Sequence, residues 1–291
     1  MKLTPKVVLI AVIVVAVAGV GIYKLKSSHP PVKKETATAV NALPPSLPST
    51  PIPGVTAVAY GVYNLNGTEI MGDNVNQAWP LASVTKLMTA EIALKNMATD
   101  TQITISSSTL SVGGNDAKLQ VGEVYPLSTA LRIMLVMSDN ITAQAIADNY
   151  GYPQFIAAMN AEAKSLGMAS TTYADPVGLS NQDVSTITDM ARLVSYLWNN
   201  NQQIFNISTY THGYVHPENR AVNHYIINID QLAGHPDFLG GKTGTTPDAK
   251  DNIVAILQRS SVNQGNPFII FVFGSSDRYA DVNKIIAAMP Q

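Results

Sequence analysis

The most informative stretch of this sequence is Trp79-Pro80-Leu81-Ala82-Ser83-Val84-Thr85-Lys86-Leu87-Met88-Thr89-Ala90. Its pattern predicts an amphipathic helix over residues 81–96, with Ser83 and Lys86 near the start. Residues three apart share a helix face, so the serine hydroxyl and the lysine amine can touch. A serine beside an unprotonated lysine is an activated nucleophile. An isolated Ser-x-x-Lys pair also occurs on ordinary surface helices, so the rest of the chain must supply the remaining parts of a site.

Two further short motifs follow in order. Ser138-Asp139-Asn140 falls at a predicted break between two helices, and Lys242-Thr243-Gly244 falls on a strand-like segment after two glycines. Ser-x-x-Lys and Lys-Thr-Gly each occur once in the chain. The ordered set of three is typical of penicillin-binding proteins and class A β-lactamases.

The flanking residues resemble one branch of these proteins, the low-molecular-mass penicillin-binding proteins, or serine D-Ala-D-Ala peptidases. The resemblance covers about residues 55–289. Its segments are Leu81 to Ala90, Ala163-Lys164-Ser165-Leu166-Gly167-Met168, Asp175-Pro176-Val177-Gly178-Leu179, Val184-Ser185-Thr186 and Asp189-Met190-Ala191. It implies a β-lactamase/transpeptidase-like fold, a serine-type D-Ala-D-Ala carboxypeptidase activity on peptidoglycan stem peptides, penicillin binding, and no cofactor.

The chain departs from that branch in two places. The second motif reads Ser-Asp-Asn, as in class A β-lactamases, where this branch often has Ser-Gly-Asn. Many carboxypeptidase members carry a second, β-rich domain, and none is expected in the residues up to Gln291. The single-domain form resembles the members that cut D-Ala cross-links, so the resemblance leaves carboxypeptidase and endopeptidase both open.

The order of predicted elements indicates an α+β fold. Strands come first, a block of helices follows, and strands with a closing helix end the chain, so the two β ends are expected to pair into one antiparallel sheet flanked by the helices. The predicted strands are 55–65, 68–71, 101–105, 117–121, 238–245, 252–257 and 268–273, and the predicted helices are 81–96, 127–137, 142–149, 153–166, 188–199 and 277–289, with a loop at 112–115.

Composition limits the function classes. Of the 291 residues 46% are hydrophobic and 13% charged, and the net charge of −2 gives no basic face, so nucleic acid is not expected as a partner. The chain has no cysteine. That excludes disulfides, thiolate metal sites, a cysteine nucleophile and lipidation at an N-terminal cysteine.

The N-terminus predicts a place outside the cytoplasm. Residues 1–26 hold an uncharged run from Val7 to Tyr23 between lysines, which reads as a single membrane anchor or, alternatively, as a signal peptide cleaved after Ala18. Residues 27–53 are a proline-rich linker that is expected to be either an extended spacer or a disordered tail. Residues 54–291 then form the peptidase domain.

Acyl transfer needs a nucleophile, a base, an oxyanion hole and a substrate clamp. Ser83 is the expected nucleophile and Lys86 its base, with a pKa lowered by burial, a helix N-terminus and the Lys242 cation. Ser83 also offers a backbone N–H from a first helical turn to an oxyanion. The resemblance adds the remaining roles. Ser138 relays a proton to the leaving amine, Asn140 holds the substrate amide, Thr245 gives the second oxyanion N–H, Gly244 keeps the strand edge free for substrate, and Lys242, Thr243 and Thr245 bind a carboxylate.

Other candidate residues favour structural roles. His212, His216, His224 and His235 have no helical ligand spacing, and His29 lies in the linker, so no metal site is expected. Asp175 and Asp183 lie where β-lactamases carry a deacylating glutamate, but Asp175-Pro-Val-Gly-Leu reads as a structural loop. Five methionines are expected in the core, namely Met88, Met134, Met137, Met159 and Met190.

These residues are compatible with three functions. The leading one is a serine D-Ala-D-Ala carboxypeptidase, with cross-link endopeptidase as its alternative at the same centre. A class A-like β-lactamase is the second alternative, against which stands the lack of a Glu-x-x-Leu-Asn glutamate. The third is a non-catalytic wall-binding module, against which stands the intact catalytic set. The expected partners are stem peptides, β-lactams and the membrane.

Overall fold

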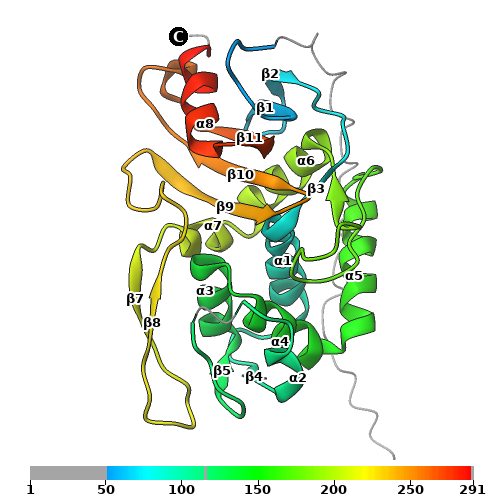
Figure 1. Ribbon diagram of the computed structural model, residues 1–291, viewed down its shortest axis with the longest axis vertical. Helices are drawn as coiled ribbons and strands as arrows, with labels where there is room; N and C mark the ends of the chain where they lie inside the picture. Colours follow the sequence, from blue (N-terminus) through cyan, green and yellow to red (C-terminus); the bar gives the residue numbers. More distant parts are fainter. Residues whose placement is uncertain (1–50, 115–116, 290–291) are drawn as a thin grey trace, which may run out of the picture. The chain divides into compact units, whose positions relative to one another are not determined.

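A five-stranded antiparallel sheet built from both ends of the domain forms the frame of the structure (Figure 1). The computed structural model describes residues 51–114 and 117–289. The strand order is β2-β1-β11-β10-β9, so β1 from the start of the domain pairs with β11 from its end. The sheet strands are β1 (Ala59–Asn64), β2 (Glu69–Asp73), β9 (Phe238–Thr246), β10 (Lys250–Leu257) and β11 (Phe268–Ser275). The predicted α+β class and the pairing of the two β ends are confirmed.

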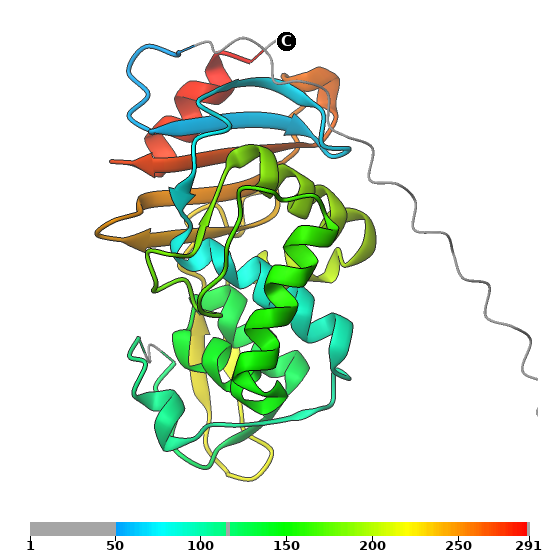
Figure 2. The same ribbon diagram turned by 90° about the vertical axis from the view of Figure 1, so that its right-hand side faces the viewer.

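Side chains of the sheet alternate between two apolar cores. Along β11, Phe271 and Phe273 point into the larger core shared with the helical block, while Ile270 and Val272 point into a smaller core under the last helix, α8 (Arg278–Ala287). All eight residues of β11 are buried because the strand is covered on both faces. Figure 2 shows α8 on one side of the sheet and the other helices on the opposite side.

The helical block carries the rest of the core. Its long helices match their predicted positions to within two residues, apart from the start of the helix that carries Ser83, and α3 matches at both ends. The helices are α1 (Lys86–Asn96), α2 (Ser107–Leu110), α3 (Leu127–Met137), α4 (Asn140–Tyr150), α5 (Tyr152–Ser165), α6 (Ile187–Asn200) and α7 (Gln203–Ser208). The five methionines predicted for the core are buried.

The helix that carries the Ser-x-x-Lys motif differs from its prediction in two ways. It opens as a 3-10 turn, η1 (Ala82–Thr85), and becomes α-helical only from Lys86. Its expected amphipathic character is wrong, since every residue from Lys86 to Ala93 is buried. The helix packs against α3, α4, α5 and α7, while η1 packs against β9 and β10, so both the polar and the apolar side chains from Lys86 to Ala93 are enclosed.

Three short strand pairs were partly missed by the sequence prediction. They are β3 (Trp79–Pro80) with β6 (Val184–Ser185), β4 (Gln102–Thr104) with β5 (Val124–Pro126), and a hairpin of β7 (His212–Val215) with β8 (His224–Ile227). The strand predicted at 117–121 is wrong. Ala117 and Leu119 bury their side chains from a loop, and the strand follows at β5.

The predicted anchor, residues 1–26, and nearly all of the predicted linker, residues 27–53, lie outside the described residues. Within residues 51–114 and 117–289, no helix is long and apolar enough to cross a membrane.

Candidate active site

Ser83 and Lys86 are in direct contact, as the spacing predicts. The Lys86 Nζ donates to the Ser83 Oγ at 2.8 Å, to the Asn140 Oδ1 at 2.9 Å and to the Val177 carbonyl at 2.9 Å. These three acceptors come from η1, from the start of α4 and from the loop after α5, and they match the three donors of an ammonium group. Lys86 therefore joins three parts of the chain at one nitrogen.

Close backbone packing fixes the turn that carries Ser83. Ala82 has a positive φ of 49°, which costs on the order of 1 kcal/mol for a residue with a Cβ. A Cβ added to Gly244 would lie 2.8 Å from the Ser83 nitrogen and 2.8 Å from the Leu81 oxygen. Gly244 is thus needed so that the turn that carries Ser83 can pack against β9. The sequence had suggested a different reason, namely room for the substrate.

Burial lowers the pKa of Lys86 to about 7. The side chain is fully buried, and losing the water around its charge outweighs the attraction of three carboxylates, Asp139, Asp175 and Asp183, which raise the pKa. Burial was among the causes expected from the sequence, whereas the three opposing carboxylates were not. An amine with a pKa near 7 spends much of its time neutral at neutral pH, which a general base requires.

The second and third motifs are joined through Lys242. Its Nζ donates to the Ser138 Oγ at 2.8 Å and to the Thr243 carbonyl at 2.7 Å. Burial, with the nearby Lys86 cation adding to it, holds the pKa of Lys242 well below its usual value. Ser138 ends α3 in the left-handed conformation, φ 58°, which turns its hydroxyl away from the helix axis toward the site. The motif serines and lysines are thus linked in pairs, Ser83 with Lys86 and Ser138 with Lys242.

The break between α3 and α4 positions Asn140. The Asp139 carboxylate caps α4 by accepting from the Thr142 N–H at 2.8 Å and from its hydroxyl at 3.0 Å. The fixed start of α4 then places the Asn140 side chain against Lys86. Asp139 is itself buried, and that burial raises its pKa. The aspartate that distinguishes this second motif from Ser-Gly-Asn is therefore a helix cap.

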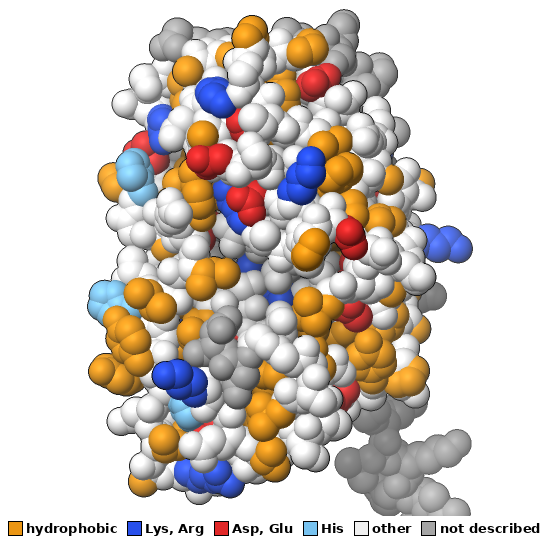
Figure 3. Space-filling view, viewed as in Figure 1, with side chains coloured by type: hydrophobic (Ala, Val, Ile, Leu, Met, Phe, Trp, Pro, Cys, Tyr) orange, Lys and Arg blue, Asp and Glu red, His pale blue; other side chains and the backbone are white. Residues whose placement is uncertain are grey.

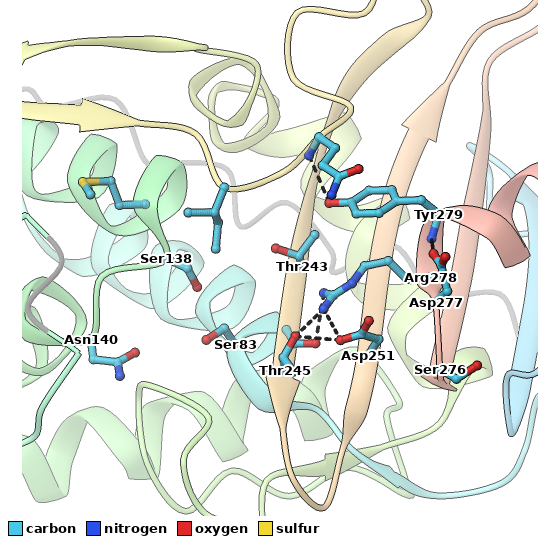
Figure 4. A pocket seen from close by; sticks show the side chains of 14 residues that line it. Ser83, Ser138, Asn140, Thr243, Thr245, Asp251, Ser276, Asp277, Arg278 and Tyr279 are labelled. Carbon is cyan, nitrogen blue, oxygen red and sulfur yellow. Dashed lines mark hydrogen bonds and ion pairs between the residues drawn. The ribbon is translucent and has the colours of Figure 1, made fainter.

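A pocket of about 560 Å³ opens onto these groups. Figure 4 shows Ser83 between Ser138 and Asn140 on one side and Thr243 and Thr245 of β9 on the other. Lys86 and Lys242 are 0% and 2% exposed and lie behind this wall. The structure thus brings together all eight residues predicted for the site, namely Ser83, Lys86, Ser138, Asn140, Lys242, Thr243, Gly244 and Thr245.

Sequence reasoning missed an arginine at the far end of the pocket. The Arg278 guanidinium donates to the Thr245 hydroxyl and to the Asp251 carboxylate, and its other nitrogen donates to the Gly244 and Asn252 carbonyls at 3.1 and 2.7 Å. Arg278 lies in no motif and begins α8, so only the packing of α8 against β10 and β11, from which the Arg278 side chain reaches β9, reveals it. It gives the pocket a cation close to Thr245.

Asn252 is a second missed residue, and it supports the nucleophile turn. It is fully buried in β10, and its amide donates to the Pro80 and Leu81 carbonyls at 2.8 and 3.1 Å while accepting from the Gly274 N–H at 2.9 Å. It therefore ties the segment just before Ser83 to two strands of the sheet. A lone asparagine in an apolar strand is the only sequence signal for it.

The segment at Asp175 is structural, as predicted. Its carboxylate accepts from the backbone N–H groups of Val177, Gly178 and Ser180 at 2.6 to 2.7 Å. Those bonds shape the loop whose Val177 carbonyl holds Lys86. The neighbouring Asp183 is also inside the loop, where burial raises its pKa to about 7. Neither carboxylate lines the pocket.

The fold and this site define a class, the serine hydrolases of the penicillin-binding type, in which a lysine activates the nucleophile. Comparison with known proteins supports that class. The family model for D-alanyl-D-alanine carboxypeptidase matches residues 48–276. This chain belongs to that family, and the expected family, fold and serine peptidase activity are confirmed.

Individual relatives agree with the family. The D-alanyl-D-alanine endopeptidase of Pseudomonas aeruginosa is 32% identical over 270 residues, which are 86% of this chain and 82% of that protein. A solved D-alanyl-D-alanine carboxypeptidase from Mycobacterium tuberculosis has a TM-score of 0.73 at 25% identity, covering 86% of this chain and 97% of its own. The ampicillin-bound penicillin-binding protein D2 of Listeria monocytogenes has a TM-score of 0.67 at 24% identity, covering 81% of this chain and 98% of its own.

Proposed function

We propose that this chain is a penicillin-sensitive serine carboxypeptidase that removes the terminal D-alanine from peptidoglycan stem peptides through an acyl-enzyme on Ser83. One observation carries the proposal. A nucleophilic hydroxyl at the pocket surface contacts, at 2.8 Å, a buried amine whose pKa is about 7. Family membership supplies the class of substrate.

The proposed reaction uses three side chains of the site, Ser83, Lys86 and Ser138. The Ser83 oxygen attacks the carbonyl carbon of the penultimate D-alanine while its proton passes to neutral Lys86. The C–N bond then breaks, the terminal D-alanine leaves with a proton delivered through Ser138, and an ester remains on Ser83. Water attacks that ester and releases the shortened peptide, so the net reaction consumes one water.

The oxyanion of the tetrahedral intermediate needs two donors. The Ser83 N–H lies in the first turn of η1, where backbone N–H groups have no intrahelical acceptor, and it faces Gly244. The Thr245 N–H is the second donor in our proposal, because Thr245 lines the same pocket on β9. The substrate carbonyl would lie between the two.

The substrate carboxylate would lie against Thr243 and Thr245. Lys242, 2% exposed and already donating to Ser138, acts on it through its charge rather than by direct contact. Arg278 adds a second cation behind the Thr245 hydroxyl. A carboxylate bound here would raise the pKa of Lys242, because opposite charges stabilise one another in a desolvated site.

A second candidate is cleavage of the D-Ala cross-link between two stem peptides. The observation that favours it is the name of the Pseudomonas relative, an endopeptidase at 32% identity. Both reactions use the same centre, and they differ in the group that leaves with the scissile amide nitrogen. Pure monomeric pentapeptide and purified cross-linked dimers, given separately to the enzyme, separate the two by the rate of free D-alanine release against the rate of monomer formation.

Penicillin binding follows from the same mechanism, with the strained lactam amide as the bond attacked by Ser83. Within the described chain the pocket is lined by two acids, Asp251 and Asp277, of which the first pairs with Arg278 and the second caps α8. With neither free to activate a water, the penicilloyl ester should hydrolyse slowly. The β-lactamase alternative requires fast hydrolysis.

Intact-mass spectrometry after penicillin treatment tests the proposal. One penicilloyl adduct is expected on the wild-type protein and none on Ser83→Ala, and the free pentapeptide should lose D-alanine only with the wild type. An adduct that persists in Ser83→Ala would refute the assignment of the nucleophile. Rapid, sustained turnover of a chromogenic cephalosporin would instead favour the β-lactamase.

The expected location is also a proposal. Peptidoglycan lies outside the cytoplasm, and we propose that residues 1–26 carry the chain there as a retained anchor, with cleavage as a signal peptide as the alternative. Membrane fractionation of cells, followed by N-terminal sequencing of the mature protein, separates the two. Retention in carbonate-washed membranes with Met1 or Lys2 at the N-terminus supports the anchor.

A further inference from the structure

The β7–β8 hairpin carries an exposed row of aromatic and aliphatic side chains. The six residues, called here the aromatic face, are Tyr210, His212, Tyr214, Tyr225, Ile227 and Ile229. Tyr214 is 68% exposed, and the other hydrophobic members are 48% to 52% exposed. Figure 3 shows hydrophobic side chains and a histidine gathered at the left edge, where Figure 1 places the hairpin. So large an exposed row is unusual for a surface that contacts only water.

The register of the hairpin puts these side chains on one face. Tyr214 pairs directly with Tyr225, and His212 pairs with Ile227. The Tyr214 and Tyr225 rings have centroids 5.2 Å apart, and the His212 ring lies 6.1 Å from Tyr225. Alternate residues on paired strands share a face. The row is therefore a preformed platform.

The opposite face of the hairpin is anchored to the domain. Val215, His224 and Ile226 are buried there, and the His224 Nε2 lies 2.9 Å from the Glu123 carboxylate, which is itself fully buried. The anchoring holds the aromatic face in one direction, so a ligand would bind to it without first having to order the hairpin.

The aromatic face continues into the active-site pocket. Two residues beyond Ile227 the chain reaches Ile229, which lines the pocket that contains Ser83. The Asn228 side chain donates to the Ser208 and Tyr210 carbonyls at 2.8 and 2.7 Å, and the Ile229 N–H donates to the Val136 carbonyl at 3.2 Å. From Tyr225 to Ile229 the row spans about 13 Å at the rise of an extended strand. A polymer whose side branch occupies the pocket can therefore rest on the face.

We propose that the aromatic face is a binding site for the glycan strand to which the stem peptide is attached. This inference rests on the proposed function, because the stem peptide in the pocket is covalently joined to an amino sugar of that strand. The chemistry of the face matches a sugar polymer. Tyrosine rings offer an apolar surface to the C–H faces of sugar rings, and their hydroxyl groups can bond the ring substituents.

Charge favours the glycan over other macromolecules. The six residues carry no charged side chain apart from His212, and Arg132 lies over the Tyr210 ring at 5.9 Å, whereas a surface for anionic lipid would need a cluster of basic residues. A protein partner would also fit an aromatic patch. The glycan is preferred because the face runs directly into the pocket, and the substrate itself supplies a ligand at that position.

The experiment compares two substrates and two matched double variants. The substrates are a sugar-free pentapeptide and the same pentapeptide on uncross-linked glycan strands. The first variant, Tyr214→Ser with Tyr225→Ser, removes both rings, and the second, Tyr214→Phe with Tyr225→Phe, keeps them. Melting temperatures confirm folding.

In the double variant with serine at positions 214 and 225 (the serine pair), KM for the glycan-attached peptide should rise roughly tenfold at unchanged kcat. The reason is that the lost contacts are aromatic ones far from the reacting atoms. Both constants for the sugar-free peptide should stay the same. The phenylalanine pair should keep a KM near that of the wild type. An equal KM for the glycan-attached peptide in the wild type and in the serine pair overturns the proposal, and so does an equal loss on both substrates.

A binding arm keeps this test separate from the proposed function. Peptide-free glycan strands should retain the wild-type protein and the phenylalanine pair in co-sedimentation, and should not retain the serine pair. If the wild type cleaves neither substrate, the proposed function fails, while glycan retention still supports the aromatic face. If the wild type is not retained on glycan, the inference is overturned, and dimerisation lost in the serine pair would then assign the face to a second copy of the chain.

Discussion

The clearest prediction concerns the proton on Lys86. Ser83 can be activated only by the neutral amine, so the rate of acylation should follow the neutral fraction of Lys86. With a pKa of about 7, that fraction is roughly 0.1 at pH 6 and roughly 0.9 at pH 8. Acylation should therefore rise about tenfold between these two pH values and level off above pH 8.

The assay is the second-order rate of labelling by a fluorescent penicillin, measured between pH 5.5 and 9.5 at constant ionic strength. Because Lys86 and Lys242 are close and both have lowered pKa values, the midpoint belongs to the coupled pair. The labelling rate is still expected to rise with pH, since the neutral fraction of Lys86 rises with pH whichever lysine loses its proton first.

A matched variant separates the base from a mere cation. Lys86→Arg keeps a positive charge and hydrogen-bond donors but cannot lose its proton in this pH range. It should label at least about 1,000-fold more slowly at every pH. A flat or falling pH profile in the wild type, or labelling of Lys86→Arg at the wild-type rate, would refute the assignment of Lys86 as the base.

Three further substitutions test how the fold supports the site. Gly244→Ala should slow acylation about 100-fold, because its Cβ would lie 2.8 Å from the Ser83 nitrogen. The control Gly213→Ala has open space around the added Cβ and should leave the rate of penicillin labelling unchanged. Asp175→Ala should lower the free energy of unfolding in urea by about 2–3 kcal/mol, since the N–H groups of the 177–180 loop lose their acceptor. Lys86→Met should abolish labelling yet raise the melting temperature at pH 7, and a lower melting temperature would contradict the cost assigned to burying this lysine.

The sequence predicted the sheet and the catalytic set because both leave local signals. Strands β10 and β11 contain apolar runs of strand length, β9 is a strand-like segment that carries Lys-Thr-Gly, and the three motifs carry fixed residue types at fixed spacings. Helix α3 was predicted at both ends since its apolar run stops at the Ser138 motif. Each of these features is visible within a few neighbouring residues.

The parts that were missed depend on contacts between distant segments. Arg278 and Asn252 reach the site from α8 and β10, and nothing beside them in the chain marks that role. The β7–β8 hairpin lacks a short turn signal, because its two strands are joined by the eight residues 216–223, without a glycine. Helix α1 was predicted to be amphipathic, whereas contacts with distant segments bury even its charged residues Lys86 and Glu91.

Burying Lys86 in α1 lowers the stability of the folded domain, and the large apolar core must offset that loss. Lowering the pKa of Lys86 from 10.5 to about 7 corresponds to a destabilisation on the order of 5 kcal/mol at pH 7 and below. The penalty fades only as the pH rises from about 7 toward 10.5, where the unfolded chain also loses the proton, so stability should increase over that window. The positive φ at Ala82 and Ser138 adds strain beside the same pocket. A sheet covered on both faces and the burial of every α1 residue from Lys86 to Ala93 offset these costs. The burial that lowers stability is the same burial that keeps Lys86 neutral enough to activate Ser83.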